Sequence, residues 1–350
     1  MTEKVRTILY GIGPLGQNVA KFILEKGYID IVGAIDLANV GKDLGEVVGL
    51  ERKTGVAVTD DANDLFANVE ADIVIHMTAS SLEKIFPQLT LCANAGLNVI
   101  TSCEELSYPF FKQEKLAGEL HKVFQKRGVT VMGTGINPGF LMDKFPLLIS
   151  GICLDVQRVK VTRMMYSRVR RPSFQKKIGT GMEKDEFLRL IDEKVITGHV
   201  GLVESAAMIV GGLGWDVDDI QELPVEPVMC ESEVTTFTDP SEKEVLMTVK
   251  PGQVAGLRSV AEARKNGEVV VSLDFVAHAN VDEPYDSVEI TGTPDLHVKF
   301  VGGMNGDMGT VAILTNSIPR ILNAAPGLLN MKDMNMPVPF TDKTARSLIS

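Results

Sequence analysis

The sequence predicts an α/β protein with two domains of different construction, and three observations support this prediction. An apolar run at residues 5–10 is followed by the sequence GIGPLG and then by an amphipathic helical pattern. Apolar strand-like runs alternate with helical patterns up to about residue 143, as in parallel sheets with helices on both faces. The alternation then stops, and strand patterns dominate. We therefore expect an α/β domain at residues 1–143, an α+β domain with a mostly antiparallel open sheet at residues 144–301, and a segment at residues 302–350 that returns to the first domain.

Composition limits the class of protein. The chain has 350 residues, of which 45% are hydrophobic and 23% charged, as in ordinary globular domains. Its net charge of −11 argues against nucleic acid as a partner, because phosphate binding requires a basic surface. We find no apolar run long enough for a signal peptide or a membrane span. The four cysteines are scattered, so we expect free thiols, no metal site and a cytoplasmic protein.

The glycine-rich turn predicts a dinucleotide site. Gly11, Gly13 and Gly16 have G-x-G-x-x-G spacing between a predicted strand and a predicted helix. The first glycine permits a tight turn, the second leaves room for the pyrophosphate, and the third lets the helix pack closely. The start of the helix attracts phosphate. We therefore predict a Rossmann domain and assign the whole turn to cofactor binding: Gly11, Ile12, Gly13, Pro14, Leu15 and Gly16.

An acidic residue after the second predicted strand favours NAD. Residues 31–35 form this strand, and Asp36 follows it, twenty residues after Gly16. An acidic residue at this distance accepts hydrogen bonds from the ribose hydroxyls of adenosine. Lys42 in the next loop either lies near that ribose, which would permit NADP as well, or is solvated. We expect NAD or NADP as the cofactor, with NAD favoured.

The next predicted strand, residues 71–77, should end at the cofactor crevice, because ligands bind at the carboxyl ends of parallel strands. His76 within it is expected to be a hydrogen-bonded core residue. The polar turn after the strand should cap the helix at residues 82–95. We assign three residues of this turn to cofactor binding: Thr78, Ala79 and Ser80.

Two carboxylates follow the strand predicted at residues 96–101. Cys103, assigned to the cofactor, precedes Glu104 and Glu105. Neighbouring side chains diverge, so at most one acid should point into the crevice. Either one of the two glutamates is a catalytic carboxylate, or both lie at the start of a helix, where the helix dipole favours acidic residues. We expect the helix itself at residues 110–127.

The strand predicted at residues 129–132 leads into a turn with three glycines and a proline, which implies a special backbone path. We assign Asn137 and Pro138 to this part of the cofactor site. Asn137 either binds the substrate or the nicotinamide amide, or stabilises its own turn.

The second predicted domain carries the cationic cluster of an acidic chain. A strand at residues 156–165 is followed by a basic loop, in which we include Arg163, Arg168, Arg170 and Arg171. An arginine there either clamps a substrate carboxylate or is solvated. His199, before a predicted helix, is a substrate ligand or a structural residue.

The remaining patterns predict an open sheet. Helices are expected at residues 183–192 and 202–213, covering one face of strands at residues 243–249, 256–263, 269–277 and 285–291. Asn266-Gly267 predicts a hairpin turn. The other face is a common surface for dimer formation. The last helix, residues 308–322, follows a glycine-rich segment, residues 302–306, that we expect near the site.

Several stretches together resemble the 2,4-diaminopentanoate dehydrogenases and the related native amine dehydrogenases, which share their fold with dihydrodipicolinate reductase. The resemblance covers essentially the whole chain and rests on residues 11–16, 32–36, 40–45, 103–109, 135–140 and 198–202. It implies NAD(P)-dependent oxidative deamination, the reverse reductive amination, and a homodimer. In that family a glutamate at this place contacts the substrate nitrogen, which implies Glu104, with Glu105 less favoured. Pro14 departs from the small or flexible residue of many relatives, but proline suits the first position of a helix.

The chemistry of this reaction suits a carboxylate. Loss of hydride leaves an iminium cation, which a nearby negative charge stabilises, and the same carboxylate can move the protons. We expect an amine or diamino acid substrate and ammonia, with Glu104 as the catalytic residue. The predicted substrate-binding residues are Asn137, Tyr166, Arg171 and His199.

Two other functions remain open. The fold also suits an imine or C=C reductase of the dihydrodipicolinate reductase type, with the basic loop binding a dicarboxylate, although we find no counterpart of the basic catalytic motif of that family. A non-catalytic NAD(P)-binding sensor would bind the cofactor without ammonia-dependent turnover.

Overall fold

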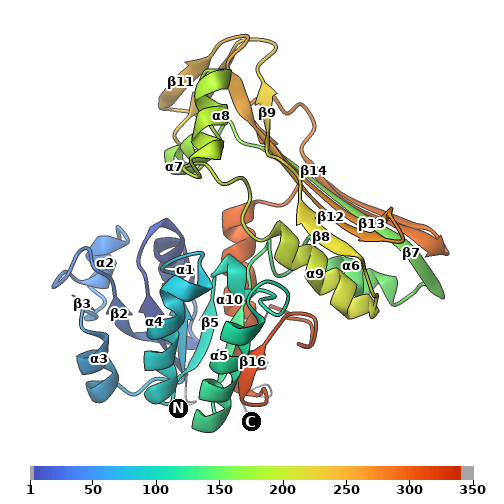
Figure 1. Ribbon diagram of the computed structural model, residues 1–350. Helices are drawn as coiled ribbons and strands as arrows, with labels where there is room; N and C mark the ends of the chain where they lie inside the picture. Colours follow the sequence, from blue (N-terminus) through green and yellow to red (C-terminus); the bar gives the residue numbers. More distant parts are fainter. Residues whose placement is uncertain (1–3, 340–350) are drawn as a thin grey trace. The chain divides into compact units, whose positions relative to one another are not determined.

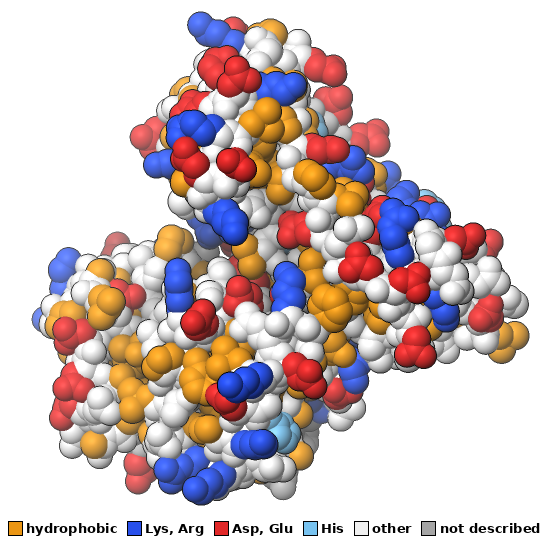
Figure 2. Space-filling model, viewed as in Figure 1, with side chains coloured by type: hydrophobic (Ala, Val, Ile, Leu, Met, Phe, Trp, Pro, Cys, Tyr) orange, Lys and Arg blue, Asp and Glu red, His pale blue; other side chains and the backbone are white. Residues whose placement is uncertain are grey.

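The computed structural model describes residues 4–339, which divide into two compact units (Figure 1). The first unit runs to Leu141 and resumes at Asn305, and the second is Met142–Met304. The boundaries expected from the sequence, after residues 143 and 301, lie close to these, and residues 340–350 of the expected returning segment lie outside the described residues. Acidic and basic side chains are interspersed over the face shown in Figure 2. Among the described helices, none is both long and apolar enough to cross a bilayer.

The first unit contains a parallel sheet of seven strands in the order β16-β6-β5-β4-β1-β2-β3. Every pair of neighbours is parallel. The strands are β1 (Val5–Tyr10), β2 (Ile29–Ile35), β3 (Val58–Thr59), β4 (Ile73–His76), β5 (Asn98–Thr101), β6 (Thr130–Gly133) and β16 (Gly327–Leu329). The Rossmann prediction is therefore confirmed.

Helices cover both faces of this sheet. They are α1 (Pro14–Leu24), α2 (Leu44–Val47), α3 (Ala62–Asn68), α4 (Leu82–Asn94), the 3₁₀ helix η1 (Glu104–Leu106), α5 (Glu114–Arg127) and α10 (Gly306–Leu322). Helices α1 and α10 pack against each other, as do α4 and α5. Apolar residues of α4 and α5 form one buried cluster with Ile8, Val74 and Val99 of the strands. Helix α10 and strand β16, red in Figure 1, belong to this unit although they follow the second one in sequence.

Helices α2, α5 and α10 differ from the sequence-based expectation, and local hydrogen bonds explain two of these differences. The loop expected after the second strand, which includes Lys42, contains α2, because Asp43 accepts a hydrogen bond from Gly45 N at 2.8 Å. Helix α10 begins two residues early, because Asn305 accepts from Met308 N at 3.0 Å. Helix α5 begins at Glu114, and residues 110–113, which were expected to be helical, are turns and irregular structure.

The second unit contains a seven-stranded sheet and a two-stranded one. The large sheet has the order β15-β14-β7-β13-β12-β8, and β9 also pairs with β12. Its strands are β7 (Asp155–Tyr166), β8 (Asp219–Glu222), β9 (Glu226–Met229), β12 (Val254–Lys265), β13 (Glu268–His278), β14 (Tyr285–Thr293) and β15 (Leu296–Val301). The small sheet pairs β10 (Val234–Phe237) with β11 (Val245–Val249).

The large sheet is mostly antiparallel, as predicted, but β7 and β13 are parallel. The predicted hairpin turn joins β12 to β13, and Asn266 and Gly267 have φ of 53° and 80°, as a type I′ turn requires.

The helices of the second unit are α6 (Lys144–Ser150), α7 (Pro172–Lys177), α8 (Lys184–Asp192) and α9 (Leu202–Leu213). Helix α9 packs on β8, β12 and β13, and α6 packs on α9, β7 and β14. The expectation that α8 covers this sheet beside α9 was wrong, because α8 contacts β9, at the end of the sheet, and α6 takes its place. The opposite face carries the ion pairs Lys160–Glu289 at 3.2 Å and Arg258–Asp274 at 2.9 Å.

Candidate functional site

The carboxyl ends of the central strands of the first unit meet at one edge, and backbone hydrogen bonds tie the segments that leave them. Gly11 N donates to Ile35 O at 2.8 Å, and Met77 N donates to Tyr10 O at 2.7 Å. Ser102 N donates to His76 O at 3.0 Å, and Thr134 N donates to Thr101 O at 2.9 Å. Every residue assigned to the cofactor from the sequence lies on this edge, in the segments that follow β1, β2, β4, β5 and β6.

The glycine turn has the space that a dinucleotide requires. Gly11 has φ of 99°, and a Cβ there would lie 2.6 Å from Met77 O. A Cβ on Gly16 would lie 2.1 Å from Gly11 O, so the helix start and the turn are in close contact. A Cβ on Gly13 would meet nothing within 4 Å. Gly13 therefore faces open space at the start of α1, where Pro14 is the first residue, and the turn fits the pyrophosphate of a nicotinamide dinucleotide.

Asp36 is fixed by the glycine turn. Its Oδ2 accepts a hydrogen bond from Ile12 N at 2.6 Å, and its Oδ1 accepts from Ala38 N at 2.7 Å. Lys42 is exposed, and its Nζ donates to Asn39 Oδ1 at 3.1 Å. The carboxylate thus stands at the place where a Rossmann domain receives the ribose, and the lysine is held by its own loop.

His76 is the hydrogen-bonded core residue that the sequence predicted. Its ring is buried, with Nδ1 3.0 Å from Thr101 Oγ1 and Nε2 2.8 Å from Gln88 Oε1. Burial lowers the pKa of His76 to about 4, so the ring is neutral near pH 7. A proton on Nε2 satisfies both contacts, since Gln88 Oε1 accepts and the Thr101 hydroxyl donates. Thr78 Oγ1 also donates to Gln88 Oε1, at 2.8 Å, so this network reaches the cofactor turn.

The helix after that turn is capped by a different residue from the one expected. Ser81 is at the N-cap position of α4, but its side chain accepts no capping hydrogen bond. Instead Glu105 Oε2 accepts from Leu82 N at 2.7 Å, and the same oxygen accepts from Gln113 Nε2 at 2.8 Å. Sequence reasoning missed this capping role because the two segments are more than twenty residues apart.

The two adjacent glutamates therefore have different surroundings. Glu105 is half-buried and engaged as a cap, whereas the half-buried carboxylate of Glu104 has no hydrogen bond or ion pair with the described residues of its unit. Cys103 is buried, and its thiol donates to Ser80 O at 3.0 Å. Burial raises the pKa of this thiol to about 12, so the thiol stays protonated near pH 7. Of the two adjacent acids, Glu104 is therefore the one whose carboxylate is not engaged by the described residues of its own unit.

The turn that contains Asn137 packs tightly against neighbouring elements of the same unit. A Cβ on Gly133 would lie 2.6 Å from the backbone of Leu106 in η1. Gly139 has φ of 122°, and a Cβ there would lie 2.6 Å from Gly135 N. Ile136 N donates to Thr310 Oγ1 at 3.3 Å, which brings in α10, an element that the sequence pattern could not connect to this turn. Asn137 and Pro138, joined by a cis peptide bond, thus lie on the same edge as η1.

Arg163 was expected in a basic loop, but it lies in strand β7, and its side chain is 2% exposed. Its Nη2 donates to Met304 O at 2.7 Å, and its Nε lies 3.7 Å from Asp286 Oδ1. Asp286 also accepts from Met304 N at 2.6 Å. Burial lowers the pKa of Arg163, and the positive charge of the nearby Arg170 lowers it too. The negative charge of Asp286 acts in the opposite direction and raises this pKa. Nη1 of Arg163 is buried and has no hydrogen-bond partner among the described residues.

His199 lies on the same face of the sheet as Arg163. Its ring stacks on Phe275, with 4.2 Å between centroids, and Phe275 is the β13 partner of Arg163. Burial, together with the charges of Lys177 and Arg163, lowers the pKa of His199 to about 3. The neutral ring therefore stands in a strongly cationic environment.

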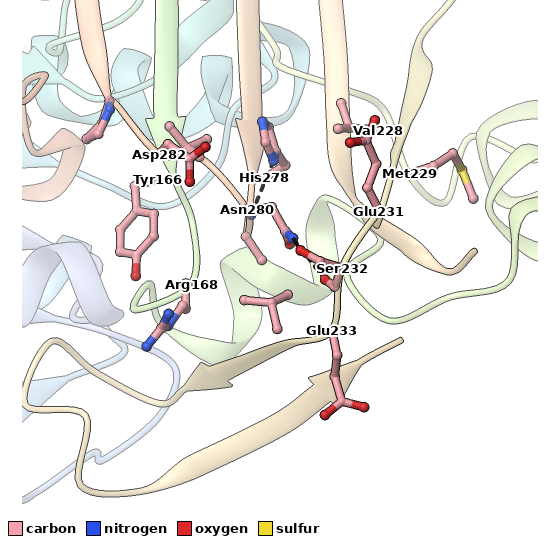
Figure 3. A pocket seen from close by; sticks show the side chains of 14 residues that line it. Tyr166, Arg168, Val228, Met229, Glu231, Ser232, Glu233, His278, Asn280 and Asp282 are labelled. Carbon is pink, nitrogen blue, oxygen red and sulfur yellow. Dashed lines mark hydrogen bonds between the residues drawn. The ribbon is translucent and has the colours of Figure 1, made fainter. Parts of the chain in front are cut away.

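The remaining predicted substrate residues are elsewhere in the second unit. Arg171 is the N-cap residue of α7, a helix that the sequence did not predict. Tyr166 lines a cavity of about 810 Å³ with Arg168, His278 and Asp282, between the ends of the sheet strands and β10 (Figure 3). Side chains alternate along a strand, so Tyr166 and Arg163 point to opposite faces. Of the predicted group, the structure brings His199 close to Arg163 and separates Tyr166 from both. Among residues 4–339 no cluster of potential metal ligands is found.

Known proteins match most of the length of the chain. A family model described as the 2,4-diaminopentanoate dehydrogenase C-terminal domain matches residues 140–349, and one described as the N-terminus of dihydrodipicolinate reductase matches residues 5–103. The chain is 31% identical to 2,4-diaminopentanoate dehydrogenase of Acetoanaerobium sticklandii, over 96% of this chain and 94% of that protein.

Two amine dehydrogenases are more distant. The chain is 21% identical to an amine dehydrogenase of Streptomyces virginiae, over 94% of this chain and 96% of that protein. The solved structure of amine dehydrogenase from Mycobacterium smegmatis superposes with a TM-score of 0.82 at 24% identity, covering 97% of this chain and 98% of that one. At this identity the structural likeness supports the fold.

Proposed function

This chain belongs to the 2,4-diaminopentanoate dehydrogenase family and is an oxidoreductase with a nicotinamide cofactor, and we propose that it catalyses the reversible oxidative deamination of a diamino acid resembling 2,4-diaminopentanoate. The products are the ketone and ammonia. The observation that carries the proposal is the Glu104 carboxylate, which stands at the cofactor edge of the sheet and has no hydrogen-bond or ion-pair partner among the described residues of its own unit.

In the proposed mechanism Glu104 accepts protons from the substrate amine and from water, and it stabilises the positive charge of the iminium. The substrate amine must lose a proton before its carbon can lose hydride, and the Glu104 carboxylate accepts that proton. Glu104 passes this proton to solvent before hydride leaves, so the carboxylate is ionised again and its negative charge stabilises the iminium cation as it forms. Glu104 then takes a proton from the water that attacks the iminium carbon. The bound nicotinamide supplies the hydride acceptor. In sum, a protonated amine, water and NAD⁺ give the ketone, ammonium, NADH and one proton.

Arg163 supports a substrate that carries a carboxylate. Its buried Nη1 has no described partner, and Asp286 is the acidic partner of its Nε. Burying a guanidinium with an unused donor is costly, so an anionic ligand would be favoured there. We propose that the substrate carboxylate binds Arg163, with the neutral His199 ring beside it. Asn137 remains the proposed contact on the first unit.

The cofactor is proposed to be NAD in preference to NADP. Both oxygens of Asp36 are fixed by the amides of Ile12 and Ala38, which holds the carboxylate where a 2′-phosphate would be repelled. Lys42 donates to Asn39 and is poorly placed to compensate.

We also propose a homodimer formed through the face of the large sheet opposite α6 and α9. The face carries alternating charges in the pairs Lys160–Glu289 and Arg258–Asp274, and its side chains are only partly exposed. Such a self-complementary pattern suits a two-fold interface.

Reductive amination of matched ketones tests the proposed substrate class. We expect NADH oxidation with ammonia and 2-amino-4-oxopentanoate, with kcat/KM about 10- to 100-fold above that for 4-aminobutan-2-one, because charge-assisted hydrogen bonds contribute about 1.5–3 kcal/mol. The second ketone lacks only the carboxylate. Equal kcat/KM for both would remove the diamino acid from the proposal and leave a simple amine. Repeating the assay with NADPH measures the cofactor preference.

A further inference from the structure

The neighbour of Glu104 makes contacts that hold η1 in place. Glu105 Oε2 accepts two hydrogen bonds, from Leu82 N at 2.7 Å and from Gln113 Nε2 at 2.8 Å. The first donor is at the start of α4, and the second is the residue before α5. One side-chain oxygen thus joins η1 to the beginnings of two helices.

Backbone contacts complete this frame. Glu105 N donates to Ser80 O at 3.2 Å, and the Cys103 thiol donates to the same oxygen at 3.0 Å. On the other side, Leu106 lies so close to β6 that a Cβ on Gly133 would be 2.6 Å from its backbone. The three-residue helix η1 is therefore fixed to the turn after β4, to the segment before α5, and to the end of β6.

A short 3₁₀ helix needs such support, because its hydrogen-bond geometry is poor and it has few internal bonds. In η1 the described internal bonds include Ser107 N to Glu104 O at 3.1 Å. Glu104 and Glu105 leave the same turn in diverging directions. Anchoring the Glu105 side chain therefore restricts the direction in which the Glu104 carboxylate points.

We propose that Glu105 is a positioning residue, which fixes η1 and thereby aims the Glu104 carboxylate at the substrate amine. This inference rests on the proposed catalytic role of Glu104. This positioning role requires one acceptor oxygen on the side chain of residue 105 and no negative charge, because Glu105 Oε2 alone accepts both hydrogen bonds. Glutamine keeps such an oxygen, so the proposal separates the two glutamates by their response to the same substitution.

The test compares Glu105→Gln, Glu105→Ala and Glu104→Gln. We expect Glu105→Gln to keep kcat within about threefold, and Glu105→Ala to lose about 10- to 100-fold, because a displacement of about 1 Å can cost that much. The affinity for NAD should change little in either. In Glu105→Ala the deuterium isotope effect from the carbon bearing nitrogen should rise, because poorly aligned chemistry becomes rate-limiting. A smaller amount of folded enzyme would not change that isotope effect.

Two further variants keep the test decisive. Gln113→Ala removes one of the two donors without uncapping α4, and it should raise the isotope effect even if Glu105→Ala does not fold. Glu119→Ala, an exposed glutamate of α5, is the matched control and should behave as the wild type.

The outcomes separate the two proposals. Wild-type kcat and isotope effect in Glu105→Ala and Gln113→Ala would overturn the positioning role. Loss of turnover in Glu105→Gln equal to that in Glu105→Ala would overturn it too, because the charge would then be required. Full activity of Glu104→Gln would instead refute the catalytic role of Glu104.

Discussion

Replacing Glu104 with glutamine is expected to lower the rate of oxidative deamination by about 10²- to 10⁴-fold, the usual contribution of a positioned acid–base group. Glutamine keeps the size and polarity of the side chain but cannot take the proton of the amine or offset the charge of the iminium. The glycine turn and Asp36 are unchanged, so the affinity for NAD should stay within about twofold. Initial rates of NADH formation and a fluorescence titration with NADH measure the two quantities.

The matched control for this substitution is Glu105→Gln, which removes the same charge from the next residue. Its acceptor oxygen remains available to Leu82 N and Gln113 Nε2, so it should stay active. Undiminished turnover in Glu104→Gln would show that another group handles the protons, and the proposed mechanism would have to be abandoned.

Gly13→Ala should separate cofactor binding from folding. Its Cβ would meet nothing within 4 Å, so the free energy of unfolding should fall by less than about 1 kcal/mol, the usual difference between glycine and alanine at an N-cap. The added methyl group occupies the space that the pyrophosphate needs. We expect the Kd for NADH to rise at least about tenfold, or ~1.4 kcal/mol. Calorimetry of cofactor binding and chemical unfolding provide the measurements.

Gly16→Ala is the control for this experiment. Here the Cβ would lie 2.1 Å from Gly11 O, so the turn must shift, and both stability and cofactor binding should suffer. If Gly13→Ala bound NADH as tightly as the wild type, the dinucleotide would not lie on this turn.

The parts of the fold that could be predicted from sequence are those encoded by neighbouring residues. Strand β1 and helix α1 follow from an apolar run, three glycines and Pro14 at the first helical position. The hairpin at Asn266 follows from the φ values that the turn demands. His76 was predicted as a core residue because it interrupts a buried strand, where a polar group must find partners.

The rest depends on contacts between distant segments. The sequence pattern predicts Arg163 in a basic loop, and only the pairing of β7 with β14, which carries Asp286, shows that its side chain is buried. The capping role of Glu105 needs Leu82, and the anchoring of the Asn137 turn needs Thr310. Neither partner can be inferred from local pattern. The parallel pairing of β7 with β13 is likewise invisible in the periodicity of either strand.

The most direct test of the proposed reaction is the dependence of NADH oxidation on ammonia. Purified protein is mixed with NADH and 2-amino-4-oxopentanoate, with and without ammonium, and the NADH consumed is compared with the diamine formed. The proposed function predicts equal amounts of both with ammonium and no oxidation without it. Oxidation that proceeds equally without ammonium would contradict the proposal and indicate reduction of another bond, and cofactor binding without any turnover would indicate a sensor.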